Sequence, residues 1–354
     1  MFEIGTGSLL SSNELIDGKF PRISAKSDNN GILGYYDTLE NNKARHFENF
    51  ITVNFFGTDG GIFYHPYKAS VEMKVHTLKI PSHNFNRYTG SFIAGALKQN
   101  LKGFDYGSQL SSSKLKKLDL KIQLPIKNSK IDFDFMERFV AELENEHIQK
   151  LENYLDETGL IDYRLTKQET QALENFENLN WSTFNLENLF GKSTRGRRLK
   201  STDRVTGTLP FITAGETDEG VSAFIGNDVT VFSANTTTID MFGSAKYRNF
   251  KYGGDDHIAV VHTDNLPKFA SVFVTSAIHK SSYNGQFNYG RNFYAKDADV
   301  LDISLPIKDG KPDYETMETV ISAIHKLVIK DVVLYVERKK EEIHKDFKTE
   351  NLTA

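Results

Sequence analysis

The sequence predicts an α/β (α+β) protein in which two repeated, mostly-β domains are separated by two long helices forming an antiparallel coiled coil. The first observation is a repeated Leu-Pro-Ile-Lys motif, at residues 124–127 and 305–308. Each copy closes a strand-like run and leads into a Met-Glu pair, Met136-Glu137 or Met317-Glu318, that opens a long helical pattern. The copies lie about half a chain length apart, which indicates one globular domain plus one helix, made twice.

The second observation is that the two globular stretches match along their length. In the first, residues 51–56 and 71–80 alternate in the manner of strands, and residues 91–99 carry a helical apolar face. Gly18 and Pro21 correspond to Gly207 and Pro210. Further matches join Phe56-Gly57 to Phe242-Gly243, Val75-His76-Thr77 to Val261-His262-Thr263, and residues 92–98 to 273–279. We therefore predict globular domains at 1–131 and 181–306.

The third observation is the spacing of apolar residues in the two intervening segments, 132–180 and 307–354. A helix is expected from Asp132 to about Glu157, and a second begins at Thr166, with Glu169 completing a capping box. Apolar residues recur at alternating three- and four-residue spacing, as in a coiled-coil seam. The predicted helix-pairing residues are Met136, Val140, Leu143, Leu151, Met317, Ile321, Ile324 and Val328.

One asymmetry separates the repeats. The second globular domain opens with Trp181-Ser-Thr-Phe-Asn-Leu-Glu-Asn-Leu-Phe190, whereas the first starts at Phe2, which aligns near Gly191. The opening segment of the first domain is therefore either truncated or supplied elsewhere.

Composition excludes several classes of protein. The 354 residues include no cysteine, which rules out disulfides, thiolate metal sites and cysteine nucleophiles. No apolar run reaches the length of a membrane span, so we expect a cytoplasmic protein without a membrane partner. The net charge is −4, but residues 132–188 hold 14 acidic against 4 basic residues, which leaves the globular domains free to meet an anionic partner.

Motifs for catalysis are absent: there is no phosphate loop, zinc-binding helix, serine elbow or cysteine site, so no catalytic residue and no metal are predicted. Gly253-Gly-Asp-Asp-His257 resembles an acidic metal cluster, but a Gly-Asp turn is the commoner explanation. His76 and His262 are interpreted as core histidines. The competing enzyme hypothesis is a carbohydrate-active β protein using Glu216, Asp255 and Asp256.

Binding to double-stranded DNA explains more of the sequence. Helical residues from Met136 to Glu157, at about 1.5 Å each, span about 33 Å, close to one turn of B-DNA. Arg and Lys suit phosphates and guanine edges, and Asn and Gln suit adenine edges. In the first domain the candidate contacts are Lys26, Lys68, Arg87, Ser108, Gln109, Lys114 and Lys116; in the second they are Arg195, Arg197, Arg198, Lys200, Lys246, Arg248, Lys251, Asn288, Tyr289 and Arg291.

The stretch from Trp181 to Phe190, the Leu-Pro-Phe-Ile-Thr-Ala-Gly-Glu run at 209–216, the Tyr-Gly-x-Asn at 289–292 and the two Leu-Pro-Ile helix openings resemble specificity (S) subunits of restriction–modification systems. Type I subunits and those of the similar type IIB enzymes are the nearest likeness, and it covers nearly the whole chain. The resemblance implies two target-recognition domains that each read half of a bipartite, asymmetric DNA site. It also implies helices that set the spacer and dock methyltransferase subunits.

The resemblance further implies that this chain is a non-catalytic specificity subunit without its own cofactor. S-adenosylmethionine would belong to the partner methyltransferase, and cleavage to a restriction/translocase subunit or a fused partner. Type I and type IIB assemblies both fit the sequence. A protein-interaction scaffold or inhibitor of the same fold, without DNA binding, is the alternative, because basic and acidic residues nearly balance in the second globular domain.

Overall fold

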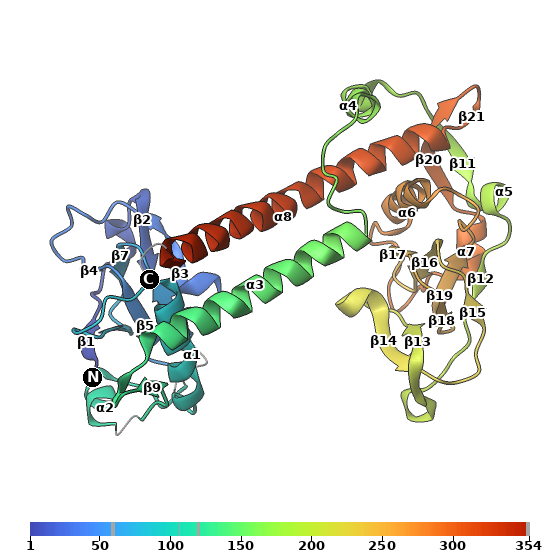
Figure 1. Ribbon diagram of the computed structural model, residues 1–354. Coiled ribbons are helices and arrows are strands. Elements are labelled where there is room, and N and C mark those ends of the chain that lie inside the picture. The colour runs from blue at the N-terminus through green and yellow to red at the C-terminus, as the bar shows by residue number, and fades with distance from the viewer. Residues whose placement is uncertain (58–60, 106, 119–120, 352–354) are drawn as a thin grey trace. The chain divides into compact units, whose positions relative to one another are not determined.

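A computed structural model describes residues 1–57, 61–105, 107–118 and 121–351 of the chain (Figure 1). The chain divides into two compact units. Unit 1 consists of residues 1–153 and 337–354, and unit 2 of residues 154–336. The long helices α3 (Phe133–Glu157) and α8 (Tyr314–Asn351) each contribute to both units. The predicted boundaries at 131, 180 and 306 follow the sequence repeat and stay a prediction.

Unit 1 contains two four-stranded sheets. The first has the order β1-β8-β5-β6, and the second has the order β3-β2-β7-β4. The strands of the first sheet are β1 (Glu3–Thr6), β5 (Phe50–Asn54), β6 (Ile62–His65) and β8 (Val75–Lys79). Those of the second are β2 (Asp17–Ile23), β3 (Ile32–Tyr36), β4 (His46–Phe47) and β7 (Ala69–Val71).

Unit 2 repeats both sheets in the same order, as β12-β19-β16-β17 and β14-β13-β18-β15. Its first sheet contains β12 (Thr194–Arg195), β16 (Thr236–Asp240), β17 (Ala245–Arg248) and β19 (Ile258–Val261). Its second contains β13 (Thr206–Ile212), β14 (Val221–Ile225), β15 (Val231–Phe232) and β18 (Tyr252–Gly254). The duplication predicted from sequence is therefore confirmed strand by strand.

Each unit packs a helix against its first sheet. In unit 1, α1 (Arg87–Asn100) buries Ile93 and Leu97 against Ile51 and Leu78. In unit 2, α6 (Lys268–Ser282) buries Val274 and Ile278 in the corresponding cluster. Every residue of the central strands β5 and β16 is buried, which is the pattern of a strand covered on both faces.

The repeated Leu-Pro motifs make the same hydrogen bonds in both units. The Asp132 N–H donates to the Pro125 carbonyl, and the Asp313 N–H donates to the Pro306 carbonyl, at 2.9 Å each. The side chains of these aspartates then accept from Phe135 N–H and Thr316 N–H, both at 3.0 Å, within the first turns of α3 and α8. These contacts satisfy helix N–H groups that would otherwise lack partners.

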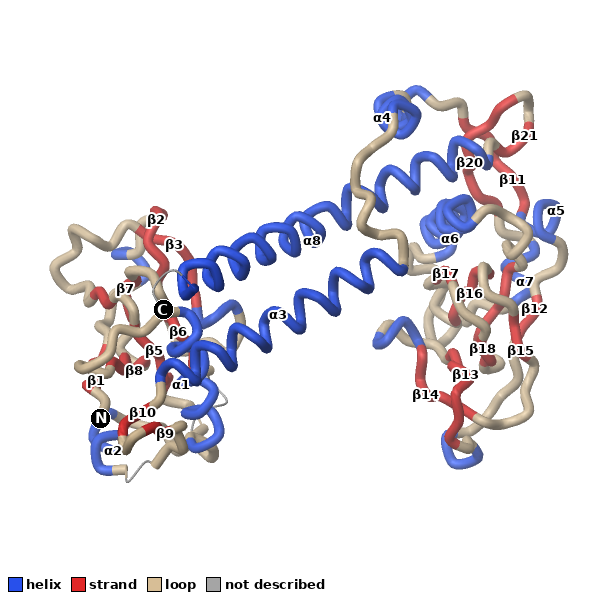
Figure 2. Tube along the Cα trace, in the orientation of Figure 1, coloured by secondary structure: helices blue, strands red, loops and turns tan. Residues whose placement is uncertain are grey.

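Small elements differ between the units. Unit 2 contains β11 (Trp181–Asn185), β20 (Asp302–Lys308) and β21 (Lys311–Pro312) in one sheet, with the short helix α5 (Leu186–Phe190) following β11. Figure 2 shows β11 and β20 side by side in red. Unit 1 has the pair β9 (Ile126–Lys127) and β10 (Lys130–Ile131), and among its described residues no strand takes the place of β11. Short helices α2 (Ser112–Lys117) and α7 (Ala295–Asp299) occupy corresponding positions in the two units.

The long helices begin close to the predicted positions, and the predicted helix-pairing residues differ in how far they are buried. Met136 and Met317 belong to the cores of their own units, and Ile321 packs against the core of unit 2. Val140 and Leu151 are half-buried, whereas Leu143, Ile324 and Val328 are exposed. Further buried apolar residues of the two helices are Ala141, Ile148, Leu155, Val320, Ala323, Val333, Val336 and Ile343. The buried residues therefore include part of the predicted seam together with residues beside it, and pairing through the seam stays a prediction.

Contacts between the helical segments are seen inside each unit. In unit 1, Lys340 of α8 pairs with Glu152 of α3 at 2.6 Å. In unit 2, α4 (Lys167–Glu174) is capped by Thr166 as predicted, and Glu169 accepts from Ser322 and Lys326 of α8 at 2.7 and 3.2 Å. Pairing of α3 with α8 along their full length stays a prediction.

The α/β class with two β-rich repeats and long helices is confirmed. One expected strand is wrong: residues 71–80 divide between β7 and β8, which belong to different sheets, and the chain turns at Glu72–Lys74. The expected helix at 91–99 begins earlier, at Arg87, because Asn86 caps it. Within the described ranges, no helix combines the length and apolar character required to cross a bilayer.

Candidate nucleic-acid interface

The arginine-rich loop of unit 2 is held rigidly against the second sheet. Arg195 ends β12, and the Arg197 N–H donates to the Gly254 carbonyl at 3.0 Å. The Leu199 N–H donates to Asp255 Oδ1 at 3.3 Å. A β-carbon on Gly196 would overlap the Gly254 carbonyl, so only glycine permits this approach. The side chains of the predicted contacts Arg195, Arg197, Arg198 and Lys200 are all exposed, as phosphate-binding groups must be.

Arg204 supports this loop from behind. Its guanidinium donates to the Leu199 carbonyl at 3.3 Å and to Ser222 Oγ at 3.2 Å, and it lies 5.0 Å from the Phe211 ring centroid. Arg198, Lys200 and Arg204 line a cavity of about 440 Å³. Sequence reasoning missed Arg204, although it follows the arginine run closely, because the intervening 3-10 turn (Ser201–Asp203) was not foreseen.

A second exposed group in unit 2 is the tight turn at Asn288–Arg291. The Arg291 N–H donates to the Asn288 carbonyl at 3.0 Å, which closes the turn. Tyr289 projects with 86 % of its surface exposed, braced edge-on by Phe242 at 5.2 Å. Arg291 lies 5.3 Å from the Phe287 ring centroid. An exposed aromatic ring between an amide and a guanidinium offers stacking and hydrogen-bonding groups that suit nucleotides.

The predicted group on β17 and β18 fits DNA contact less well. Arg248 is only 2 % exposed and donates through Nε to Thr238 Oγ1 at 2.9 Å. Burial lowers the pKa of its guanidinium. The prediction that Arg248 contacts DNA is therefore wrong, because a core position opposite Thr236 withholds its side chain from any surface partner. Lys246 pairs with Glu216 at 3.1 Å, while Lys251 is exposed.

The carboxylates of the competing enzyme hypothesis have structural partners. Burial raises the pKa of Glu216, but hydrogen bonds from Ser244 and Lys246 outweigh this and leave its pKa below the ordinary value. Asp255 accepts the Leu199 N–H, and Asp256 lies 3.3 Å from His257. Asp255, Asp256 and His257 could bring three ligand atoms within 4.8 Å of one another, but such an acidic turn alone does not establish a metal site.

The predicted contacts of unit 1 are more dispersed. Lys26 pairs with Asp28 at 3.3 Å, and Lys68 is exposed in the segment before β7. Ser108 is an exposed residue of the loop before α2. Gln109 is half-buried, and its backbone carbonyl accepts a hydrogen bond from Lys114 Nζ at 3.0 Å. Lys116 is exposed on α2. Among the described residues of unit 1, these candidates are not gathered in one loop as they are in unit 2.

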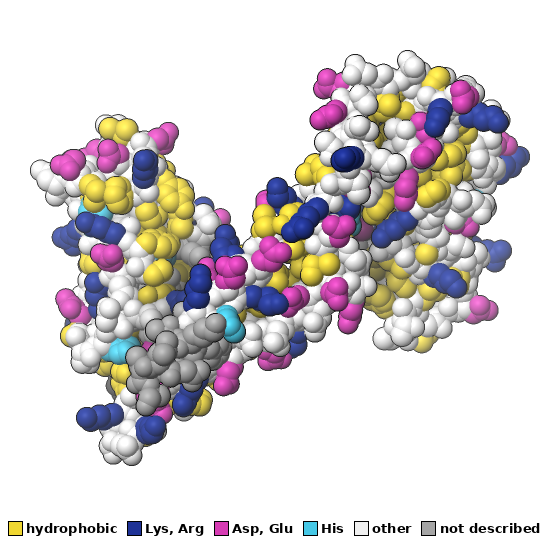
Figure 3. Space-filling model, turned by 45° about the horizontal axis from the view of Figure 1, so that its top comes forward, with side chains coloured by type: hydrophobic (Ala, Val, Ile, Leu, Met, Phe, Trp, Pro, Cys, Tyr) yellow, Lys and Arg dark blue, Asp and Glu magenta, His cyan; other side chains and the backbone are white. Residues whose placement is uncertain are grey.

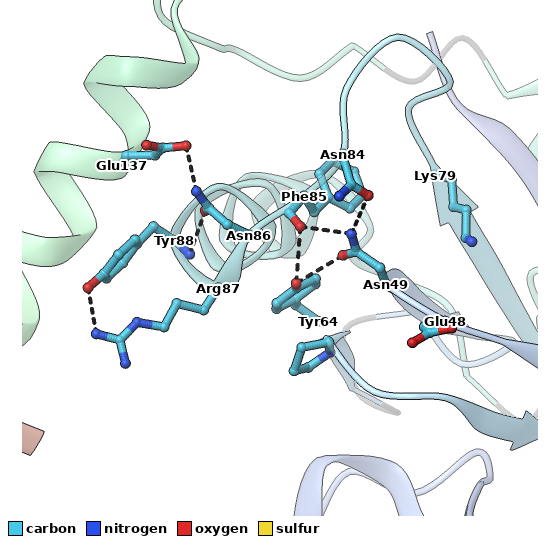
Figure 4. A pocket seen from close by; sticks show the side chains of 11 residues that line it. Glu48, Asn49, Tyr64, Lys79, Asn84, Phe85, Asn86, Arg87, Tyr88 and Glu137 are labelled. Atoms are coloured by element: carbon cyan, nitrogen blue, oxygen red, sulfur yellow. Dashed lines mark hydrogen bonds between the residues drawn. The ribbon is translucent and has the colours of Figure 1, made fainter. Parts of the chain in front are cut away.

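Arg87 lies at the mouth of a polar pocket in unit 1 (Figure 4). Its guanidinium pairs with Glu342 at 3.1 Å and with Glu144 at 3.4 Å, and also donates to the Tyr88 hydroxyl. The same pocket contains a network in which Asn49 donates to Asn84 and accepts from Tyr64. Arg87 therefore ties α1 to α3 and to the last turns of α8, which is a structural role that the sequence did not indicate.

The two predicted core histidines differ. His76 is fully buried, stacks on Phe55 at 4.6 Å, and its Nε2 lies 2.8 Å from the Leu110 carbonyl. His262 follows β19 and is half-buried, with its Nε2 3.0 Å from Thr194 Oγ1. The core prediction is confirmed for His76 only. On the face seen in Figure 3, basic and acidic side chains are interspersed.

The family model of the type I restriction modification DNA specificity domain matches residues 1–153 and again residues 178–334. The chain belongs to this family. Each match covers one copy of the two-sheet architecture, as the duplicated sequence implied.

Two known proteins illustrate the relationship. The specificity subunit S.BcgI of a type II restriction enzyme from Heyndrickxia coagulans is 27 % identical over 254 residues, which are 71 % of this chain and 70 % of that protein. A crystal structure of a type I restriction–modification S subunit from M. genitalium superposes with a TM-score of 0.63 at 15 % identity, covering 98 % of this chain and 92 % of the other. The likeness to the M. genitalium S subunit shows a shared fold.

Proposed function

We propose that this specificity-family chain is the DNA-recognition subunit of a restriction–modification complex. Each unit reads one half of a bipartite, asymmetric site in double-stranded DNA. The observation that supports this most directly is the glycine-dependent loop at Arg195–Lys200, which presents exposed basic side chains on a backbone fixed to the sheet. Fixed backbones suit readout because base contacts depend on position, whereas phosphate contacts supply affinity.

The proposed contacts of unit 2 are Arg195, Arg197, Arg198, Lys200, Lys251, Asn288, Tyr289 and Arg291, with Lys246 available if its pairing to Glu216 opens. Those of unit 1 are Lys26, Lys68, Ser108, Gln109, Lys114 and Lys116, and Arg87 takes part only by exchanging its carboxylate partners. Arg248 is not among the proposed DNA contacts, because its side chain is buried.

The proposed division of labour assigns no catalysis to this chain. A partner methyltransferase, which binds S-adenosylmethionine, would flip and methylate a base in each half-site. A restriction subunit or fused partner would cleave unmodified DNA. The helices α3 and α8 would dock these partners and set the spacer, and the complex would act in the cytoplasm, where its DNA target lies.

Selection from a randomised duplex library tests this proposal. The purified chain, with and without its methyltransferase partner, is incubated with the library and the bound fraction is sequenced. We expect two short conserved blocks separated by a fixed gap. Absence of any enriched sequence when the partner is present would contradict DNA recognition and favour the scaffold alternative.

A further inference from the structure

The segment that follows the Tyr289 turn of unit 2 forms, together with Arg195, a small open cavity. Its volume is about 380 Å³, and it is lined by Arg195 at the end of β12 and by Tyr294, Ala295 and Lys296 at the start of α7. The side chains of Arg195, Tyr294 and Lys296 are exposed. Two cations and a phenol ring therefore line one cavity, and only Arg195 among them was predicted from the sequence.

The acidic side chains of α7 fix the backbone at the rim of this cavity. The Tyr294 N–H donates to Asp297 Oδ2 at 2.8 Å. The Ser193 N–H, just before β12, donates to Asp299 Oδ1 at 2.8 Å. Both carboxylates of the short helix are thus engaged by backbone groups, and they hold β12 and the segment before α7 in place.

The cations of the cavity are available to a ligand. Among the described residues of the chain, neither Arg195 nor Lys296 forms an ion pair. Lys296 Nζ lies 5.9 Å from the Tyr294 ring centroid. Asn292 Nδ2 donates to the Tyr294 hydroxyl at 3.5 Å, so the hydroxyl can donate its own proton to a further group. The cavity therefore offers two positive charges and one neutral donor.

Unit 1 repeats the backbone frame of this cavity. Tyr294 is the N-cap residue of α7, and Ser111 is the N-cap residue of α2. The residue before each cap, Phe293 or Leu110, is buried. Its N–H donates to the carbonyl of the first residue after β16 or β5, at 2.9 or 2.6 Å respectively. Ser111 therefore occupies the position of Tyr294.

The other two positions differ between the units in the same way. Arg195 and Thr6 each precede the glycine that closely approaches the second sheet of its unit. Two residues beyond the cap, Lys296 corresponds to Ser113. The frame thus carries arginine, tyrosine and lysine in unit 2 but threonine and two serines in unit 1. The same backbone presents two positive charges in unit 2 and only neutral hydroxyls in unit 1.

We propose that this cavity of unit 2 binds one phosphodiester group of the DNA backbone. Arg195 and Lys296 neutralise its charge, and the Tyr294 hydroxyl donates to a phosphate oxygen. Guanidinium and ammonium groups match phosphate oxygens in charge and hydrogen bonding. Such a contact carries no sequence information itself but fixes the register of a reader on its half-site. This inference rests on the proposed DNA recognition, and it makes Tyr294 and Lys296 positioning residues.

A neutral phosphate analogue tests the proposal. A duplex carrying the site found by library selection is made with methylphosphonate in place of one phosphate at a time. Each duplex is titrated with the full chain bound to its methyltransferase partner. We expect one position, within a single half-site, at which neutralisation weakens binding by about threefold to tenfold and reduces the salt slope by about 1.

Arg195→Thr and Lys296→Ser install the residues of unit 1. Each should weaken binding to the unmodified duplex by about threefold to tenfold and reduce the salt slope by about 1. On the duplex neutralised at the sensitive position, neither variant should weaken binding further, because the charge it contacts is already absent. Unfolding free energies of the variants provide the check on folding, and Lys296→Gln, which keeps most of the side-chain stem, is the second lysine variant.

Two further variants serve as controls. Tyr294→Phe removes only the hydroxyl, so it should weaken binding without changing the salt slope. Lys311→Ser changes an exposed lysine of β21 outside the cavity, and it should alter neither quantity.

Three results would overturn the proposal. If the variants weaken binding equally on unmodified and neutralised duplexes at every position, the cavity holds no phosphate, although DNA recognition stands. If selection enriches no site, both this inference and the proposed function fail. If Lys296→Ser weakens capture of the methyltransferase partner and leaves DNA binding unchanged, the cavity belongs to a protein interface.

Discussion

Unit 1 and unit 2 share the strand order of both sheets but differ in the side chains placed on that frame. The Gly7-Ser8 pair in unit 1 and the Gly196-Arg197 pair in unit 2 make equivalent backbone hydrogen bonds, Ser8 N–H to the Val71 carbonyl and Arg197 N–H to the Gly254 carbonyl. One position thus carries a small hydroxyl in one unit and a guanidinium in the other. The comparison teaches that the hydrogen-bonded frame is repeated while the loop chemistry varies, which agrees with the proposed reading of two unlike half-sites.

The largest effect is expected from the glycines that allow this frame. Gly196→Ala should destabilise unit 2 by about 3 kcal/mol, because the new methyl group would overlap the Gly254 carbonyl and the backbone must shift. Gly7→Ala should cost unit 1 about as much, since its β-carbon would overlap the Val71 carbonyl. The free energy of unfolding in urea measures each loss of stability, and hydrogen exchange shows which unit is affected. Gly95→Ala, on an open helix surface, is the control and should not destabilise. Equal stability of all three variants would contradict the close approach.

The pH dependence of stability is expected to differ between the units, because His65 in unit 1 occupies the core position that Arg248 occupies in unit 2. Burial lowers the pKa of His65 to about 4. Its unfolded pKa is near 6.5, so between these values the unfolded state binds more protons and stability falls as pH falls. Unit 1 should lose about 2 kcal/mol between pH 7 and pH 5 from this group.

The variant His65→Gln should flatten that pH dependence, because glutamine does not titrate. The measurement is the free energy of unfolding at several pH values, with exchange in the β5 strand reporting on unit 1. Parallel pH profiles for the native chain and the variant would show that His65 is not buried in its neutral form.

In unit 2, Glu169 of α4 accepts hydrogen bonds from Ser322 and Lys326 of α8. Burial raises the pKa of Glu169, but bonds from the Thr166 N–H, Ser322 and Lys326 outweigh it and lower the pKa to about 2. The carboxylate therefore stabilises the fold above its unfolded pKa of about 4.5, and this contribution is lost as pH falls towards 2.

Glu169→Gln should destabilise unit 2 by about 2 kcal/mol at neutral pH, because it removes charge-assisted bonds. Thermal unfolding and exchange in α4 are the readouts. The exposed Glu174→Gln on the same helix is the control and should have little effect. If both variants behave alike, the Glu169–Lys326 contact does not hold α4 to α8.

The smallest effect is expected from a single exposed arginine. Arg197→Ala should weaken DNA binding by roughly threefold to tenfold and reduce the salt slope by about 1, because one phosphate contact is lost. Titration of a duplex carrying the selected site, at several salt concentrations, measures both quantities. Lys311→Ala, an exposed lysine outside the proposed set, should change neither. Unchanged affinity and slope in Arg197→Ala would remove this residue from the interface.

Sequence patterns predicted the elements well where local chemistry decides them. The repeated Leu-Pro-Ile-Lys motif, the Thr166–Glu169 capping box and the helix from about residue 132 to Glu157 all depend on neighbours within a few residues, and all are confirmed. The candidate site was predicted less completely. The exposed side chains of Arg195, Arg197, Arg198 and Lys200 fit a binding role, but burial of Arg248 and the ion pairs of Arg87 depend on residues far away in sequence.

The sequence by itself determined the duplication, the α/β class, the long helices and the family to which the chain belongs. Repeats and helix signals can be recognised from residues that are close together in the sequence. Only the tertiary structure decided which residues of each helix are buried, which arginines reach the surface, and that β11 pairs with β20 in unit 2. These outcomes depend on packing between distant segments: Ile303 is buried because β11 lies beside β20, and Ile122 remains half-buried because unit 1 has no such strand among its described residues.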